Sequence, residues 1–351
     1  MFDLLIITHL PVFYKVNLYN KLNEKMKVCV IFLSSDTSEK RSSDFSKLNG
    51  ITFEYFTLSN GSFQERNKIK SCLNLVDLIR KVTFKKIIVS GWDQPEFWLA
   101  IALNKKENSS LALESTIFES KVSGISGAIK RYLVSRVSTI FASGEPHKKL
   151  AIALRFQGRI IITGGVGVIN KPIGSMLKKN EYERRFLFVG RLCEEKNLNT
   201  LINVFNSLSE HSLTIVGAGE EYVNLKNRSN SNISFVGSIS NELLKEYFAN
   251  NNFLILPSVS ETWGLVVEES LYYSTPVLLS DRCGCLDIIE NSENGFVFDP
   301  YDEDKLMELV SSIDNNMYKK LIENVAKYDL QLKDENQVNC YFEALYENRS
   351  S

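Results

Sequence analysis

The sequence has no long apolar run, no internal repeat, and few cysteines and histidines. No segment of its 351 residues approaches the roughly 20 consecutive apolar residues that a membrane-spanning helix needs. The start, Met1 to His9, carries an acid and no basic leader, so we interpret it as a first buried strand and not as a signal peptide. Self-similarity at the periods of solenoid proteins is also missing. We therefore expect a folded globular chain in the cytoplasm.

Cysteine is scarce and has no metal-ligand spacing. The six cysteines stand at positions 29, 72, 193, 283, 285 and 340. Only Cys283-Gly-Cys285 forms a close pair, and one such pair supplies two ligands where a zinc site needs four. We expect these side chains to act as small buried hydrophobic groups in a reducing compartment.

Charge is nearly balanced overall but unevenly distributed. The net charge is −1, yet residues 1–170 hold 24 Lys and Arg against 14 Asp and Glu, a net of +10. The remainder carries a net of −11. A basic half indicates an anionic partner, such as an anionic membrane surface or a lipid-linked diphosphate. Ordinary variation of a solvated surface is the alternative.

Apolar, β-branched runs alternate with helical patterns along the whole chain, which is typical of parallel sheets covered by helices. The length favours two domains, and the polar segment 170–184, interrupted by Pro and Gly, is the expected boundary. The predicted strands are Leu4–Thr8, Val28–Phe32, Ile51–Phe56, Ile87–Ser90, Leu111–Leu113, Thr139–Ala142, Arg159–Ile162, Phe186–Val189, Leu213–Val216, Ile233–Val236, Phe253–Leu256, Val277–Ser280 and Phe296–Phe298.

The most informative passage runs from Pro257 to Ser270 and holds two acids, Glu261 and Glu269, eight residues apart. Eight helical steps turn through about 800°, which is about 80° away from a whole number of turns. The two acids therefore cannot share a helix face, so we expect Glu261 in a loop and Glu269 in the helix that follows. Parallel sheets bind ligands at such strand-to-helix turns. We interpret the neighbouring Glu268 as solvated or capping.

Two bases follow an earlier strand of the second half, in the segment Gly190-Arg191-Leu-Cys-Glu-Glu-Lys196-Asn197. Arg191 comes directly after the strand and Lys196 opens the next helix, whose N-terminus adds backbone donors for an anion. Asn197 could cap that helix. The alternative is that both bases are ordinary surface residues.

These motifs, with Leu213–Gly219, Ile233–Gly237, Gly284–Asp287, Asn294-Gly295 and Pro300–Asp302, follow one another in the order of a known family. Together they resemble the retaining GT-B glycosyltransferases of glycosyltransferase family 4, over roughly residues 185 to 308. The resemblance implies an α/β fold with two Rossmann-like parallel-sheet domains that face each other across a cleft. Residues 1–170 would bind the acceptor and residues 171–330 the nucleotide-sugar donor. A helix in 331–351 would pack back toward the first domain.

The resemblance also implies roles for individual residues. Arg191 and Lys196 would stabilise the leaving diphosphate, and Glu261 would contact the donor sugar, so these three are the expected catalytic residues. Glu269 would accept from both ribose hydroxyls, which suits a carboxylate. The expected donor-binding residues are Gly190, Gly217, Gly219, Gly237, Ile239, Thr262, Trp263, Gly264, Leu265 and Glu269. The chain departs from the family at Asn197, where glycine is usual, and at Asp287, where a glutamate is usual.

Acceptor contacts are harder to assign. His9, Tyr14 and Lys15 follow the first strand, while Asp93 and Glu114 follow two later ones, so these five are the acceptor-side candidates. Structural or capping roles are the alternative for each. A further stripe could form a basic amphipathic helix at a membrane surface, or could be buried against the sheet with a solvated opposite face. It consists of Ile125, Ile129, Tyr132, Leu133 and Val137, with Lys130, Arg131 and Arg136.

The resulting hypothesis is a retaining glycosyltransferase that moves a sugar from a nucleoside-diphosphate donor, expected to be a UDP-sugar. Its acceptor would be a glycan or an undecaprenyl-diphosphate-linked lipid of bacterial surface polysaccharide (O-antigen or capsule) at the cytoplasmic face of the inner membrane. We expect no cofactor, no metal and no nucleic-acid partner; Asp302 is interpreted as a helix cap. The alternatives are a GT-B sugar-nucleotide epimerase or hydrolase, and a non-catalytic donor-binding subunit.

Overall fold

The computed structural model describes residues 1–38, 48–172, 181–290 and 293–346. The chain divides into two compact units. Unit 1 comprises Met1–Asn170 and Leu332–Ser351, and unit 2 comprises Lys171–Gln331. Part of the predicted boundary segment, residues 173–180, lies outside the described residues.

Unit 1 is built on a seven-stranded parallel sheet with the order β3-β2-β1-β4-β5-β6-β7. The central strands read as continuous apolar runs because both faces of a parallel sheet are covered. The strands are β1 (Phe2–Thr8), β2 (Val28–Phe32), β3 (Glu54–Thr57), β4 (Phe84–Val89), β5 (Ser109–Leu113), β6 (Thr139–Ala142) and β7 (Arg159–Ile162).

Alternate strand residues enter two hydrophobic clusters, one on each face of this sheet. Leu5 and Ile7 of β1 join the cluster that is covered by four helices, α2, α3, α4 and α5. Leu4 and Ile6 join the cluster that is covered by α1 and α13. The helices are α1 (Phe13–Lys25), α2 (Lys68–Lys81), α3 (Pro95–Ala102), α4 (Gly124–Ser135), α5 (Glu145–Ala153) and α13 (Leu330–Tyr346), with a 3-10 turn at Lys106–Asn108.

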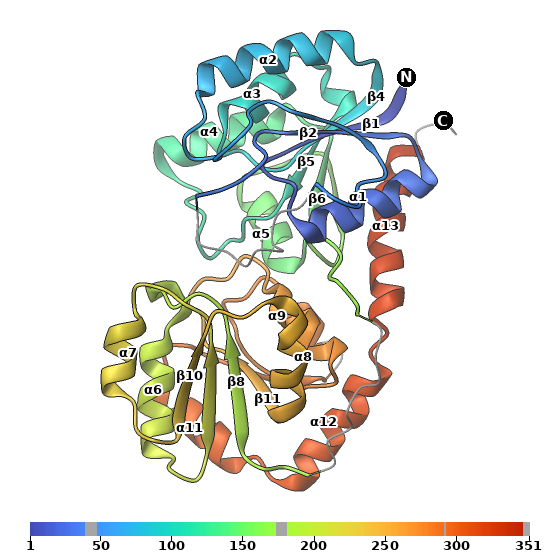
Figure 1. Ribbon diagram of the computed structural model, residues 1–351. Coiled ribbons are helices and arrows are strands. Elements are labelled where there is room, and N and C mark those ends of the chain that lie inside the picture. Colours follow the sequence, from blue (N-terminus) through green and yellow to red (C-terminus); the bar gives the residue numbers. More distant parts are fainter. Residues whose placement is uncertain (39–47, 173–180, 291–292, 347–351) are drawn as a thin grey trace. The chain divides into compact units, whose positions relative to one another are not determined.

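Helix α13 is the last element of the chain and lies beside α1, the first helix (Figure 1). Its buried residues Val338, Tyr341 and Ala344 belong to the same cluster as the inner face of α1. The ring of Tyr341 stacks on Phe141 of β6 with 4.4 Å between centroids. Without α13, Phe141 of β6 would lose the ring that covers it on this face, so the helix completes the core of unit 1.

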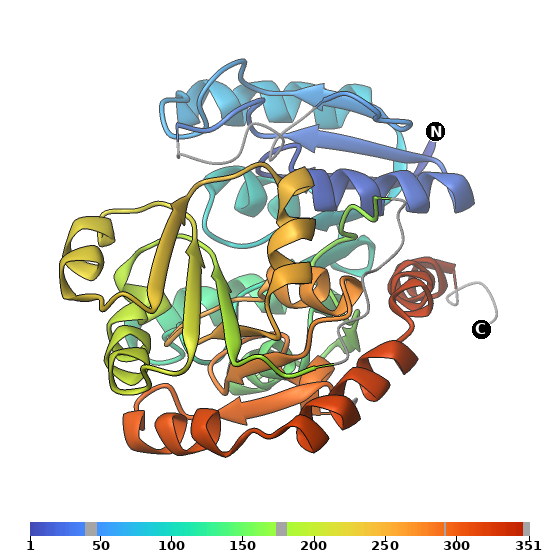
Figure 2. The same ribbon diagram turned by 60° about the horizontal axis from the view of Figure 1, so that its bottom comes forward.

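Unit 2 repeats this arrangement with a six-stranded parallel sheet in the order β10-β9-β8-β11-β12-β13. Helices α6 and α7 lie on one face of the sheet, and α8 and α9 lie on the other (Figures 1 and 2). The strands are β8 (Arg185–Val189), β9 (Ser212–Val216), β10 (Ile233–Gly237), β11 (Phe253–Leu256), β12 (Val277–Ser280) and β13 (Gly295–Phe298). The helices are α6 (Leu198–Ser207), α7 (Tyr222–Arg228), α8 (Asn241–Asn250), α9 (Leu265–Tyr272), α10 (Leu286–Glu290), α11 (Glu303–Ser312) and α12 (Asn315–Lys327), with a 3-10 turn, η2, at Glu194–Lys196.

In both sheets the strand that comes first in sequence lies in the interior of the sheet. The next two strands lie on one side of it, and the remaining strands lie on the other side. The loops after β1 and β4 in unit 1, and after β8 and β11 in unit 2, therefore leave the same edge in opposite directions. Open parallel sheets bind ligands at such switch points. The strand orders thus mark one position in each unit where a site is expected.

The predicted fold class, two Rossmann-like α/β domains, is confirmed. Every predicted strand overlaps an observed one, but the third was predicted to start at Ile51 and starts at Glu54. Asn20 of α1 explains the difference. Its side chain accepts from the backbone N–H of Thr52 and donates to the carbonyl of Gly50, so this stretch is tied to a helix instead of pairing with β2. Among the described residues, no helix has both the length and the apolar character needed to cross a bilayer.

Tyr341→Ala should destabilise unit 1 while leaving unit 2 intact. The side chain is only 8% exposed and stacks on Phe141, and removal of a buried aromatic ring costs about 3–5 kcal/mol. Amide hydrogen exchange should therefore accelerate in β6 and stay unchanged in β11. Tyr132→Ala, which removes a ring that is 63% exposed, is the control and should change neither strand. Equal protection of β6 in both variants would contradict the assignment of α13 to this core.

Candidate active site

The loops after β8 and β9 are held together by direct backbone contact. The N–H of Gly190 donates to the carbonyl of Val216, and the N–H of Leu192 donates to that of Ala218, both at 3.0 Å. A Cβ at Gly217 would lie 1.8 Å from the carbonyl oxygen of Gly190, and the φ of Gly217 is +143°. A Cβ at Gly219 would lie 2.2 Å from the carbonyl oxygen of Leu192. Glycine at both positions is therefore required by close packing of the two turns.

Asn197 stands between the 3-10 turn η2 and helix α6 and has a left-handed backbone, with φ +52°. Asparagine tolerates this conformation better than most residues, which explains how it can replace the usual glycine. The prediction that its side chain caps α6 is wrong, because that side chain accepts no backbone N–H of the helix. Instead it donates to the carbonyl of Pro300 at 2.9 Å and accepts from the hydroxyl of Thr200.

Lys196 and Glu261 form an ion pair that spans the switch point of unit 2. Lys196 ends the turn after β8, and Glu261 lies in the loop after β11. Their side chains are 11% and 17% exposed. The two loops are also joined where the N–H of Val259 donates to the carbonyl of Glu195 at 2.9 Å. The structure thus brings together two of the three residues predicted to be catalytic.

Arg191, the third of these residues, is half-exposed and forms an ion pair with Glu195 at 2.7 Å. In the described parts of the chain it makes no hydrogen bond or ion pair with Lys196 or Glu261. Glu195 was not among the predicted residues. Its position four residues after Arg191 is a spacing at which opposite charges often meet, and this spacing could have indicated it.

The loop that carries Glu261 is supported by the loop after β12. The N–H of Gly284 donates to the carbonyl of Glu261 at 2.8 Å, and the N–H of Cys285 donates to that of Trp263 at 3.2 Å. Cys283 and Cys285 are fully buried, and burial raises the pKa of both thiols well above its usual value. These two cysteines are therefore packing residues, as predicted, and so are the buried Cys29 and Cys193. Cys72 and Cys340, also unpaired, are half-buried.

Trp263 and Glu268 form a buried hydrogen bond at the start of α9. The indole Nε1 donates to Oε1 of Glu268 at 2.7 Å, and the two side chains are 3% and 0% exposed. The interpretation of Glu268 as solvated or capping is therefore wrong, because it anchors the loop from inside. Gly264 precedes α9 with φ +95°, a conformation that favours glycine.

The other residues of the predicted donor set follow the same sheet edge. Glu269 is half-buried on α9, and with burial it raises the pKa of Tyr273. Gly237 ends β10 and accepts from the N–H of Gly217 at 2.9 Å. Thr262 is exposed, and Ile239, Leu265 and Asp287 are half-buried. The predicted donor set is therefore distributed over the loops that follow β8, β9, β10 and β11 and over helix α9, which follows the last of them.

In unit 1, four of the five acceptor-side candidates form two pairs. Nε2 of His9, after β1, lies 3.0 Å from both carboxylate oxygens of Asp93, after β4, so this pair spans the switch point of that sheet. Burial acts to raise the pKa of Asp93, but the hydrogen bonds from His9 and Gln94 outweigh it and lower the pKa to about 2. Asp93 is therefore ionised at neutral pH.

Lys15 and Glu114 form the second pair, at 2.8 Å. Lys15 is 5% exposed on α1, where burial acts to lower its pKa and the carboxylate of Glu114 more than reverses the effect. The ammonium stays charged and paired. Tyr14 is half-buried, and its carbonyl accepts from the N–H of Val168 at 2.9 Å.

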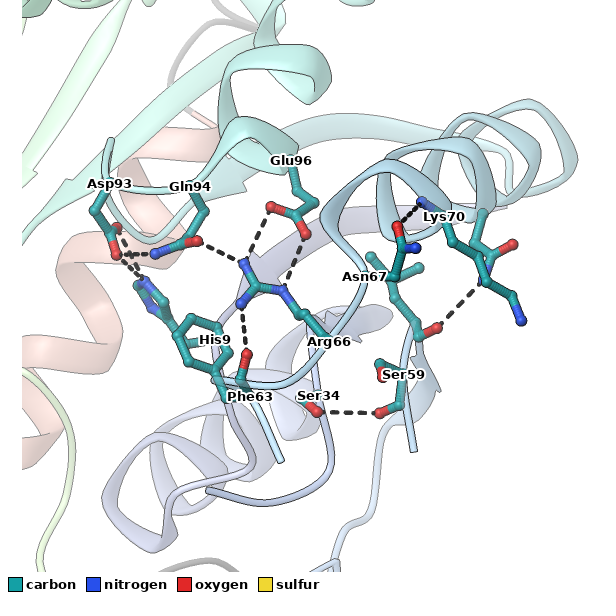
Figure 3. Close-up of polar contacts among 12 residues, drawn as sticks. His9, Ser34, Ser59, Phe63, Arg66, Asn67, Lys70, Asp93, Gln94 and Glu96 are labelled. Carbon is teal, nitrogen blue, oxygen red and sulfur yellow. Dashed lines mark hydrogen bonds and ion pairs between the residues drawn. The ribbon is translucent and has the colours of Figure 1, made fainter. Parts of the chain in front are cut away.

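Arg66, Gln94 and Glu96, which were not predicted, extend the first pair into the protein (Figure 3). Gln94 and Glu96 flank Pro95, which opens α3, and a proline at a helix start could have directed attention to them. Arg66 stands in a loop far away in sequence and had no such signal.

Among the described residues, no group of three or more histidine, cysteine or acidic side chains is placed to hold a metal ion. Asp302 accepts from the N–H of Lys305 at 3.1 Å at the start of α11, so its predicted capping role is confirmed. A cavity of about 390 Å³ lies between α10, β13 and α12, lined by Ile289, Phe296, Met317 and Leu321 among others. None of its lining residues belongs to the predicted site.

Known proteins resemble this chain in sequence and in fold. Residues 174–328 match the model of the family described as "Glycosyl transferases group 1". The chain is 26% identical over 194 residues to an "Uncharacterized 41.2 kDa protein in cps region" of Klebsiella pneumoniae, covering 52% of this chain and 54% of that protein. It is 28% identical over 181 residues to the "O-antigen biosynthesis glycosyltransferase WbnH" of Escherichia coli, covering 50% and 51%. The chain spans about half the length of these relatives.

Solved structures show the same fold over the whole chain. The apo form of the "lipopolysaccharide outer core galactosyltransferase WaaB" aligns with a TM-score of 0.69 at 16% identity, covering 97% of this chain and 99% of that one. Anabaena Alr3699/HepE in complex with UDP and glucose aligns with a TM-score of 0.71 at 12% identity, covering all of both chains. The chain thus has the GT-B fold, its residues 174–328 match the group 1 glycosyl transferases, and the comparisons support a glycosyltransferase.

Proposed function

We propose that the protein is a retaining glycosyltransferase that transfers a sugar from a nucleoside-diphosphate donor, a UDP-sugar, to a glycan or lipid-linked acceptor. The observation that carries the proposal is the Lys196–Glu261 pair across the switch point of unit 2. It sets a cation and a carboxylate beside two glycine turns whose backbones are in contact. This is the edge at which open parallel sheets bind nucleotides.

The chemistry of glycosyl transfer suits these residues. The bond from the anomeric carbon to the diphosphate oxygen breaks while the sugar takes on oxocarbenium character, so negative charge develops on the leaving group. The ammonium of Lys196 and the guanidinium of Arg191 would stabilise that charge. Glu261 would accept from donor sugar hydroxyls and Glu269 from the ribose. Retention fits a front-face mechanism in which the leaving phosphate assists, because no side chain of the predicted set is an evident nucleophile.

The pathway and partners are proposed from the relatives and from charge. One relative is named for a cps region and another for O-antigen biosynthesis, which favours bacterial surface polysaccharide. The bound UDP of HepE favours a UDP-sugar donor. The net charge of +10 in residues 1–170 suits an undecaprenyl-diphosphate-linked acceptor at the cytoplasmic face of the inner membrane. His9, Tyr14, Lys15, Asp93 and Glu114 are the proposed acceptor contacts. No metal or other cofactor is part of the proposal.

Release of UDP from a UDP-sugar panel, with and without undecaprenyl-diphosphate-linked glycan, tests the activity. We expect acceptor-dependent release, and ¹H NMR of the product should show the anomeric configuration of the donor. Release at the same rate without acceptor would favour a sugar-nucleotide epimerase or hydrolase. Donor binding without any turnover would favour a non-catalytic subunit. A product with the opposite anomeric configuration would refute retention but not the glycosyltransferase activity.

Arg191→Ala should reduce kcat about 100- to 1,000-fold, as loss of one group that stabilises developing charge does in other enzymes. Glu269→Ala should instead mainly weaken donor binding, because a ribose contact is made equally in the ground and transition states. Steady-state kinetics with donor varied at saturating acceptor separates the two effects.

Arg185→Ala is the matched control. Arg185 lies at the opposite end of β8, its side chain is 49% exposed against 48% for Arg191, and it is paired with Glu183 at 3.2 Å. It should keep wild-type kinetics. Wild-type kcat in Arg191→Ala would refute the role of that residue.

Helix α4 supports the proposal of a membrane partner. Of the predicted apolar stripe, Ile125, Ile129 and Tyr132 are 82%, 49% and 63% exposed. Leu133 and Val137 were predicted to belong to the same stripe, but both are buried in the core of unit 1. From Lys121 to Arg136 the chain has four bases and no acid. Lys121 and Arg136 are exposed, while Lys130 lies over the ring of Trp92 and Arg131 donates to the carbonyl of Val122. An exposed apolar stripe between bases suits an anionic lipid surface.

The double variant Ile125→Ser/Ile129→Ser should weaken binding to phosphatidylglycerol-containing vesicles about tenfold or more, because each lost side chain forfeits the transfer of apolar surface into lipid. Vesicle sedimentation at low salt measures the effect. Ile69→Ser/Leu73→Ser is the matched control, since these two exposed side chains have the same spacing on α2. Loss of binding in the α2 variant alone would show that α2, and not α4, contacts the membrane. Unchanged binding in both variants would refute the proposed membrane contact of α4.

A further inference from the structure

Only one of the two ring nitrogens of His9 has a hydrogen-bond partner among the described residues. Its Nε2 lies 3.0 Å from both oxygens of Asp93, and its ring contacts Phe97 and Phe63 edge to face, with centroids 4.8 and 5.5 Å away. Within the described part of the chain, Nδ1 has no hydrogen-bond partner. The side chain is 27% exposed. One nitrogen is therefore fixed while the other is available at the switch point of unit 1.

Behind Asp93, a series of polar side chains leads to a fully buried ion pair (Figure 3). Gln94 donates from Nε2 to Asp93 at 2.6 Å and accepts at Oε1 from Nη2 of Arg66 at 2.5 Å. Arg66 in turn pairs with Glu96 through Nε at 3.1 Å and Nη2 at 3.3 Å. The side chains of Arg66 and Glu96 are 2% and 0% exposed.

The direction of every hydrogen bond in this series is determined by its buried end. A guanidinium can only donate, so the amide oxygen of Gln94 must face Arg66 and its NH₂ group must face Asp93. Asp93 is ionised and therefore accepts from both Gln94 and His9. The proton of a neutral His9 must then be on Nε2, which leaves a lone pair on Nδ1.

The surroundings keep this end of the series rigid. Arg66 donates from Nη1 to the carbonyl of Phe63 at 2.8 Å, and its guanidinium lies 4.0 Å from the centroid of that ring. Phe63 therefore contacts both Arg66 and His9. Gly91 has φ +128°, and a Cβ there would lie 3.0 Å from the carboxylate of Asp93 and 3.7 Å from the His9 ring. A larger residue would crowd the pair.

We propose that Arg66 and Gln94 are positioning residues that hold His9 in the Nε2–H tautomer, so that Nδ1 presents a fixed lone pair to a hydroxyl group of the acceptor substrate. The proposal rests on the proposed function for the identity of the substrate, and no proton transfer is part of it. A site that accepts a hydrogen bond from a substrate hydroxyl discriminates against compounds that lack the group. The acceptor class is therefore a hydroxyl-bearing glycan.

The tautomer can be observed directly because the chain has only three histidines, His9, His147 and His211. His147 is an internal reference. Its Nδ1 accepts from the backbone N–H of Gly144 at 3.1 Å, so the neutral ring must also carry its proton on Nε2. Long-range ¹H–¹⁵N NMR spectra of the full chain at pH 8, where an ordinary imidazole is neutral, should show His9 with the pattern of His147.

Gln94→Leu is the decisive variant because it cuts the series between Asp93 and Arg66 but leaves the buried ion pair intact. Exchange of the His9 Nε2 proton with water should become about tenfold faster, the change that loss of roughly 1.4 kcal/mol produces. Asn104→Leu is the control. It removes an amide near the other end of α3 that donates to the carbonyl of Ala100 at 2.7 Å, and it should not change the His9 signal.

In the UDP-release assay, Gln94→Leu should raise the KM for undecaprenyl-diphosphate-linked glycan about tenfold and leave the donor KM unchanged. An Nδ1–H tautomer in the wild type would overturn the proposal. So would equal exchange rates in Gln94→Leu and Asn104→Leu. If the wild type shows no acceptor-dependent release but the NMR results hold, the proposed function fails while the positioning of His9 stands.

Discussion

The structure of the candidate site depends on one pair of opposite charges that meets at the switch point of the unit 2 sheet, between β8 and β11. β8 and β11 are neighbours in space, but their loops leave toward opposite sides. Lys196 and Glu261 join those loops where neither side chain is well solvated. A charge that is nearly buried is costly without a partner, so each residue fixes the position of the other. Unit 1 has a counterpart at the same topological point, where His9 meets Asp93.

Around this pair, the site is built from backbone as much as from side chains. Gly217 and Gly219 allow the loops after β8 and β9 to touch, and the buried Trp263–Glu268 bond fixes the loop after β11 from inside. Few of these groups can move independently. A rigid arrangement of this kind suits a reaction in which developing charge must be met by groups already in place.

Much of this could be predicted from the sequence, and the failures have physical reasons. Strands were found because buried parallel strands are continuous apolar runs, and the loops of unit 2 because their motifs occur in a known order. The burial of Glu268 was not predicted because its hydrogen bond to Trp263 forms only when the loop folds back onto the helix, and helical spacing does not indicate such a contact. Arg66 was missed because its partners lie about thirty residues away in sequence, and no local pattern connects them. β3 starts later than predicted because the side chain of Asn20 on α1 holds the preceding residues through a tertiary hydrogen bond, which the local sequence does not indicate.

The return of the chain to unit 1 has a consequence for biosynthesis. Unit 1 begins at Met1 but contains Leu332 onward, so the ribosome makes all of unit 2 before the last piece of unit 1 is available. Until α13 emerges, the sheet face around Phe141 has no cover over part of its apolar surface. Domains fold as units during synthesis, and exposed apolar surface in such intermediates promotes aggregation. The last strands and helices of unit 2 are therefore synthesised before the core of unit 1 can be completed.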